Sequence, residues 1–92
     1  MSSFDAVAEP SRRGLLDLLL AAPRPVGELA AATGMSQPNT SRHLRILRDA
    51  GLVECRTAGQ RRIYAIRPEG FAELAGWLTP YALLWQRAVT GR

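Results

Sequence analysis

Apolar residues recur along the chain with two different periods, and each change of period marks a new element. Spacings of three and four are typical of helices that bury one face. They predict helices over residues 5–8, 10–22, 26–33, 37–50 and 68–90. Alternation with a period of two predicts strands over residues 52–57 and 61–67, joined by a turn at residues 58–60. Residues 23–25, Pro-Arg-Pro, are expected to form a rigid connector, and Pro80 to kink the last helix.

The order of these elements predicts a fold. Gly34 is a good helix stop and Ser36 a good N-cap, so residues 26–50 are expected to form a short helix, a turn and a longer helix. The hairpin at 52–67 then follows as a wing. The sequence therefore predicts a mostly α (α+β) fold. We expect one domain over residues 1–92, a winged helix-turn-helix with a two-stranded β-hairpin wing and a C-terminal dimerisation helix.

Positive charge is concentrated in the middle of the chain. All 12 basic residues are arginine, a preference that a GC-rich coding bias would also produce. Residues 42–67 hold seven of these arginines and two acidic residues, a net charge of +5, whereas the rest of the chain carries −1. Such asymmetry indicates a surface that faces a polyanion.

The second helix of the helix-turn-helix carries one polar face. We expect Gln37, Ser41 and Arg42 to contact base edges, because the N-terminal half of this helix enters the major groove in this motif. Arg45 and Arg48 are expected to grip phosphate. The predicted DNA-binding residues are Ser36, Gln37, Pro38, Asn39, Ser41, Arg42, Arg45, Arg48, Arg61 and Arg62. Two simpler interpretations stay open: solvated arginines on the helix, and a charged hairpin edge that blocks aggregation.

The last helix has two apolar stripes, which a domain of this size cannot easily bury. We therefore expect part of this surface to lie between two subunits, although both stripes could also pack within one. The predicted interface residues are Phe4, Leu74, Trp77, Leu78, Tyr81, Leu84 and Trp85. A two-fold dimer would place two recognition helices about 34 Å apart, and this predicts an inverted-repeat operator.

Other kinds of chemistry find little support in the sequence. No catalytic constellation, phosphate loop or Cys/His metal spacing is visible, so we expect neither an enzyme, nor a metal site, nor a cofactor. His43 is expected to be a packing residue and Cys55 inert. No apolar run of 18 residues and no signal peptide are present, so we expect no membrane partner and a cytoplasmic location.

Several spaced motifs together resemble the ArsR/SmtB-type winged-helix repressors. The matching segments are Ala8-Glu9-Pro10-Ser11-Arg12-Arg13, Val26-Gly27-Glu28-Leu29-Ala30, Ser36-Gln37-Pro38, Ser41-Arg42-His43-Leu44-Arg45-Ile46-Leu47, Ala50-Gly51-Leu52-Val53 and Gly59-Gln60-Arg61-Arg62-Ile63-Tyr64. The resemblance implies a homodimeric transcriptional repressor that releases DNA in response to a signal. Trp77-Leu78-Thr79-Pro80-Tyr81 and Leu84-Trp85 look like a metal-independent branch of that family.

The chain departs from the family's metal sensors. Those proteins carry a cysteine pair where this chain has Ala30-Ala31-Ala32, or Asp and His ligands on the last helix, which here has neither. Thr40 stands where the family usually has a buried aliphatic residue.

The sequence thus favours a sequence-specific regulator that binds double-stranded DNA, a homodimeric repressor at an inverted-repeat operator. The alternative is a winged-helix protein-interaction module. A third possibility is a repressor that responds to an apolar effector held between the last helices.

Overall fold

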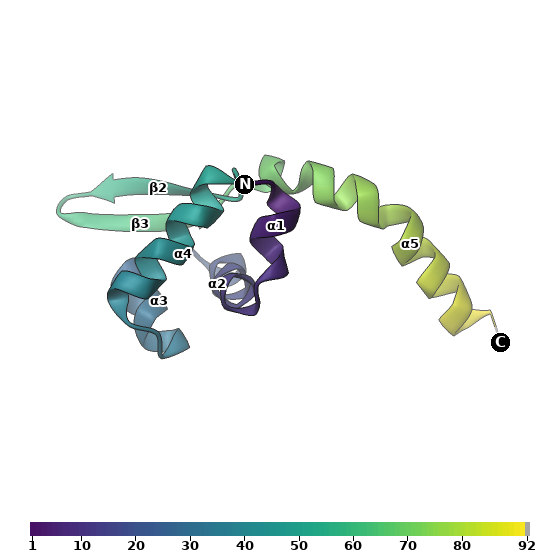
Figure 1. The fold of residues 1–92 in the computed structure, drawn as a ribbon, viewed down its shortest axis with the longest axis horizontal. Helices are drawn as coiled ribbons and strands as arrows, with labels where there is room; N and C mark the ends of the chain where they lie inside the picture. Colours follow the sequence, from purple (N-terminus) through teal and green to yellow (C-terminus); the bar gives the residue numbers. More distant parts are fainter. Residues whose placement is uncertain (92) are drawn as a thin grey trace.

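The computed structural model describes residues 1–91. Its elements, in chain order, are α1 (Ser3–Ala8), α2 (Pro10–Ala21), β1 (Arg24–Pro25), α3 (Val26–Thr33), α4 (Gln37–Asp49), β2 (Val53–Ala58), β3 (Arg61–Ile66), the 3-10 turn η1 (Pro68–Phe71) and α5 (Ala72–Thr90). The β2–β3 hairpin extends from one side of the helical body and α5 from the other (Figure 1), so the molecule measures 53 × 24 × 21 Å. The predicted winged helix-turn-helix fold is confirmed.

Local capping positions the helix-turn-helix. α3 ends at Gly34, whose φ of 78° lies in the left-handed region that glycine adopts without strain. Ser36 then caps α4, because its hydroxyl oxygen accepts a hydrogen bond from the backbone N–H of Asn39 at 3.2 Å. The turn between these two signals is short, and it fixes the direction in which α4 leaves α3.

The inner face of α4 belongs to the core. Leu44 and Leu47 are fully buried and pack with leucines from α2, α3 and the start of the wing. Thr40 is also fully buried, but its hydroxyl donates to the Ser36 carbonyl oxygen at 2.8 Å. A polar side chain is tolerated at this position because its hydrogen bond is made within the helix.

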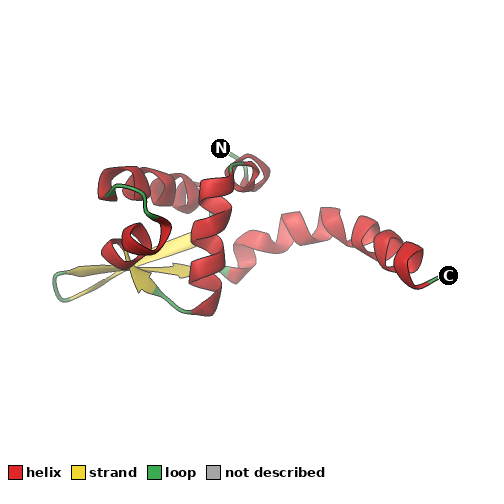
Figure 2. Ribbon diagram, turned by 90° about the horizontal axis from the view of Figure 1, so that it is seen from below, coloured by secondary structure: helices red, strands yellow, loops and turns green. Residues whose placement is uncertain are grey.

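The sheet has three strands in the order β1-β3-β2, all antiparallel. The prediction of a rigid connector at residues 23–25 was therefore wrong, since Arg24 and Pro25 pair with Tyr64 and Ile63 of β3. A proline is compatible with an edge strand because its missing N–H can face away from the ladder. The wing itself agrees with the prediction to within one residue at each end, and it turns at Gly59 (φ 65°), beyond the helical body (Figure 2).

The last helix projects away from the body. α5 has 19 residues and continues through Pro80, with a ribbon that bends along its length (Figures 1 and 2). The Thr79 hydroxyl donates to the carbonyl oxygen of Ala75 at 2.6 Å. Leu74, near the start of α5, packs against the core, but no residue of α5 is buried. The helix therefore carries its apolar side chains into solvent. No helix within residues 1–91 is both long and apolar enough to cross a membrane.

Candidate nucleic-acid interface

The outward face of α4 is polar, cationic and slightly hollow. Pro38, Ser41, Arg42 and Arg45 are all exposed and together line a depression of about 280 Å³. They lie opposite the buried leucines of the same helix. The structure therefore brings together four of the predicted DNA-binding residues on one accessible surface, as their helical spacing required.

The other predicted residues of this segment lie around that depression. Ser36, Gln37 and Arg48 are exposed. Asn39 is half-buried; its side-chain oxygen accepts from Nη2 of Arg42 at 2.8 Å and its amide nitrogen lies 3.5 Å from the sulfur of Met35. Asn39 is thus a hydrogen-bond partner of Arg42 in the free protein.

Most of the arginines in the basic segment keep their charge unneutralised. Within residues 1–91, Arg56 pairs with Glu54 at 2.6 Å and Arg67 with Glu69 at 3.0 Å. The five remaining arginines of the segment form no ion pair among the described residues: Arg42, Arg45, Arg48, Arg61 and Arg62. The last two are exposed beside the hairpin turn. Helix and wing therefore offer two sets of free cations, which suit phosphate contacts.

A buried arginine, which the sequence interpretation did not single out, stands behind α4. Arg12 of α2 donates from Nε to the carbonyl oxygen of Ala6 at 2.7 Å and from Nη2 to that of Asp5 at 3.3 Å. Its Nη1 lies 3.4 Å from Nδ1 of His43. A pattern did exist: Arg12 precedes the buried Leu15 by three residues, and this spacing places both on the inner face of α2.

The prediction that His43 packs rather than binds a ligand agrees with its burial, since the side chain is only 5% exposed. Burial lowers the pKa of His43 below its ordinary value. The Arg42 guanidinium lowers this pKa further, the Glu9 carboxylate opposes the change, and Arg12 adds to it. The imidazole is therefore neutral at pH 7, with one donor and one acceptor nitrogen.

The predicted interface residues form the second unusual surface. Five of the predicted side chains, all on α5, are between 52% and 69% exposed: Trp77, Leu78, Tyr81, Leu84 and Trp85. Phe4 of α1 is half-buried and its ring meets that of Trp77 edge-on, with centroids 5.8 Å apart. Leu74 is half-buried against the core. Two further exposed residues, Leu83 and Val89, were not among the predicted ones.

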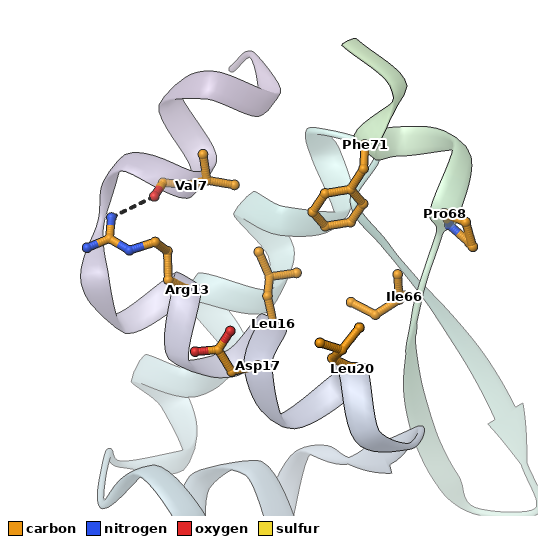
Figure 3. Close-up of a pocket in the computed structure, with 8 residues that line it drawn as sticks. All are labelled: Val7, Arg13, Leu16, Asp17, Leu20, Ile66, Pro68 and Phe71. Carbon is orange, nitrogen blue, oxygen red and sulfur yellow. Dashed lines mark hydrogen bonds between the residues drawn. The ribbon is translucent and has the colours of Figure 1, made fainter. Parts of the chain in front are cut away.

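Beside the base of α5 lie two open apolar cavities. The larger, of about 600 Å³, lies between α1, α2 and η1 and is shown in Figure 3. Its lining includes Leu16 and Leu20, and the aliphatic part of Arg13, whose guanidinium is hydrogen-bonded to the Val7 carbonyl oxygen at 2.8 Å. The smaller, of about 440 Å³, reaches Phe4 and Trp77. Val7 and Phe71 line both cavities, which therefore lie side by side; the two together are called the apolar trough below.

The helix-turn-helix and the start of the wing match a known sequence family. Residues 9–54 fit the model of the bacterial regulatory proteins of the arsR family. The chain belongs to the arsR family. It is 40% identical over 89 residues to the HTH-type transcriptional regulator Rv2034 of Mycobacterium tuberculosis, a match that covers 97% of this chain and 80% of that protein. It is 31% identical to the transcriptional repressor SdpR of Bacillus subtilis, over 82% of this chain and 83% of that one.

Solved structures of related proteins have the same winged helix-turn-helix fold. The homodimeric winged helix-turn-helix DNA-binding domain Mb0332 of Mycobacterium bovis, a possible ArsR-family transcriptional regulator, superposes with a TM-score of 0.72 at 36% identity, over 91% of this chain and 78% of that one. Four other regulators of Mycobacterium tuberculosis are longer, and the chain spans between 30% and 63% of their length.

This ArsR-family protein is therefore a DNA-binding transcriptional regulator, from a family that is not enzymatic. Among residues 1–91 no group of three or more His, Cys, Asp and Glu side chains is arranged to hold a metal ion.

Proposed function

We propose that this protein is a homodimeric repressor that binds an inverted-repeat operator in double-stranded DNA. The observation that carries the proposal is the outward face of α4, with exposed Ser41, Arg42 and Arg45 around one depression and no acidic side chain among the residues that line it. As a regulator of transcription it would act in the cytoplasm.

In this proposal residues 26–50 read the DNA. Gln37, Ser41 and Arg42 contact base edges in the major groove, where a guanidinium can donate two hydrogen bonds to guanine and a glutamine amide can pair with adenine. Arg45 and Arg48 hold phosphates and so fix the register of the helix on the duplex. Ser36, Pro38 and Asn39 lie beside these residues at the start of α4 and would face the edge of the major groove.

The wing, residues 52–67, contacts the backbone or the minor groove beside the recognition helix. Arg61 and Arg62 are the candidates, because they are exposed near the hairpin tip and are not neutralised by a carboxylate within residues 1–91. A wing that instead served only to block aggregation would carry the same arginines, but their removal would leave DNA affinity unchanged.

Residues 68–90 would form the dimer, together with α1. The support is physical: a projecting helix with six large apolar side chains more than half exposed is costly to leave in water. The homodimeric state of Mb0332 and the name of SdpR support a dimeric repressor by similarity.

We further propose that the signal for release is not a metal ion. The support lies in the sequence: Ala30-Ala31-Ala32 replaces a cysteine pair, and α5 contains neither Asp nor His. The apolar trough is large enough for a small organic effector, and Arg13 and Asp17 at its edge supply polar groups.

Selection from a random duplex library with the purified protein at about 150 mM salt tests the proposal. Enrichment of an inverted repeat with half-sites about 10 base pairs apart, centre to centre, is expected. A control selection uses the variant Arg42→Ala, which should enrich the same repeat with one base position relaxed. A folded dimer that enriches no sequence would contradict the proposal and would favour the protein-interaction alternative.

A further inference from the structure

Behind the DNA-facing surface, a line of hydrogen-bonding groups runs from α1 to the recognition helix. The buried Arg12 guanidinium ends at Nδ1 of His43, and on the far side of the same imidazole Nε2 lies 3.4 Å from Nη2 of Arg42. We propose that Arg12 is a positioning residue for Arg42 and that it acts through the tautomer of His43. This inference rests on the proposed role of Arg42 in reading bases.

The first step is the choice of tautomer. A guanidinium can only donate hydrogen bonds, so the nitrogen that faces Arg12 must accept one. This requires the lone pair on Nδ1 and the proton on Nε2. The opposite tautomer would place two donors against each other at a side chain that is 9% exposed, where water cannot substitute for the lost acceptor. Arg42 is exposed, so water can accept from its guanidinium, and a donor facing a donor costs less there than beside the buried Arg12.

The second step is the effect on Arg42. With its proton on Nε2, His43 offers Arg42 a donor, and two donors cannot form a hydrogen bond. The hydrogen bond of Arg42 Nη2 to the side-chain oxygen of Asn39, at 2.8 Å, is then its one side-chain bond on this side of the helix among the described residues. The guanidinium stays on the outer face of α4, over the depression it shares with Ser41. Without Arg12, Nε2 could lose its proton to Nδ1, accept from Arg42 and draw the guanidinium back toward the helix.

Arg12 is itself held in place by the short helix that carries Phe4. Its Nε and Nη2 are committed to the carbonyl oxygens of Ala6 and Asp5, so only Nη1 is left for His43. Arg13, the next residue, donates in a similar way to the carbonyl oxygens of Val7 and Ala8 but has no hydrogen bond to α4. It is therefore a control for the measurement of the His43 tautomer in Arg12 variants.

The tautomer can be measured directly, because His43 is the one histidine in the chain. Nitrogen NMR of the imidazole, on protein freed of any histidine tag, is expected to show a protonated Nε2 and an unprotonated Nδ1. In Arg12→Met the proton should move toward Nδ1, whereas Arg13→Met should leave the spectrum unchanged. A protonated Nδ1 in the wild-type protein, or no change in Arg12→Met, would overturn the proposal whatever the protein binds.

A double-mutant cycle on operator DNA tests the consequence. Arg12→Met should weaken operator binding about 3- to 30-fold, a loss within the range for neighbours that share a hydrogen-bond network, and should have little effect in the Arg42→Ala background. Equal losses in both backgrounds would mean that Arg12 acts on the fold alone, and would overturn the inference. A wild-type protein without operator preference would contradict the proposed function instead, and the NMR result would still stand.

If Arg12→Met does not fold, two substitutions of His43 replace it. Asparagine places an amide oxygen near the position of Nδ1 and no atom near Nε2, whereas glutamine places its amide near Nε2. His43→Asn should retain operator affinity to within about threefold. His43→Gln should lose about 3- to 30-fold, because its amide oxygen would accept a hydrogen bond from the Arg42 guanidinium and hold it away from the DNA. Equal affinities of these two variants would overturn the proposal.

Discussion

Replacing Trp85 with alanine should separate the two protomers of the proposed dimer. The side chain is 69% exposed on the projecting part of α5. A tryptophan can bury about 200 Å², so about 140 Å² of its surface is still available for a partner to cover. At about 25 cal/mol per Å² this surface corresponds to at most about 3.5 kcal/mol, and truncation of a central interface residue costs at least about 2 kcal/mol.

Two-fold symmetry doubles the free energy that the substitution removes from the dimer interface. Each interface residue occurs twice in a dimer, so we expect Trp85→Ala to weaken dimerisation by about 4–7 kcal/mol. The dimer dissociation constant would then rise about 10³- to 10⁵-fold. The fold of each protomer should be nearly unaffected, because the side chain lies on a helix with no buried residue.

Sedimentation equilibrium over a wide concentration range measures this change, and circular dichroism checks that the helices remain. Gln86→Ala is the matched control, since Gln86 is exposed on the same turn and neutral. We expect the control to shift the dimer constant by less than about tenfold. Equal dissociation constants for the two variants would refute the placement of Trp85 in the interface and, with it, the proposed role of the end of α5.

Three further outcomes are expected. Arg42→Ala should cost about 1–3 kcal/mol in operator binding and relax preference at one base position; equal weakening on all DNA sequences, measured by competition binding, would show that Arg42 holds only phosphate. Since the pKa of His43 is lowered below 6.5, the unfolded chain takes up this proton first as pH falls. Above pH 6.5 His43 should therefore not lower the stability. Below that pH the melting temperature should fall more steeply in the wild type than in His43→Asn, and equal slopes would contradict this prediction. Gly70→Ala should destabilise the fold by about 1–3 kcal/mol, because an added Cβ would lie 1.9 Å from the carbonyl oxygen of Gly51. Gly14→Ala, with no atom within 4 Å of such a Cβ, should be neutral or stabilising in denaturant titrations.

The parts of the fold that the sequence predicted are those specified locally. Ser36 and Gly34 mark the ends of their helices through contacts within four residues, so both boundaries could be placed without knowing the rest of the chain. The outer face of α4 follows in the same way, because helical spacing alone puts Ser41 and Arg45 on one side and Leu44 on the other.

The parts that the sequence could not predict depend on contacts that are distant along the chain. β1 is too short to show any alternation, and Arg24 becomes a strand residue only because Tyr64 lies beside it. Arg12 has the spacing of a core residue, but its acceptors come from α1 and from His43, 31 residues away. The close contact between Gly70 and Gly51 has no sequence pattern at all.

The separation of the two surfaces suggests how such a protein would be controlled. The five unneutralised arginines lie on α4 and the wing, whereas most of the exposed large apolar residues lie on α5, which leaves the body on the side opposite the wing (Figure 1). A single half-site contact of this size would be weak at physiological salt, and pairing two of them raises affinity only if their spacing matches the DNA. Since α5 would set that spacing, a ligand in the trough at its base could abolish binding without touching α4. We therefore expect effector-insensitive variants to map to residues that line the trough, such as Leu20 and Phe71, while losses of base preference map to α4.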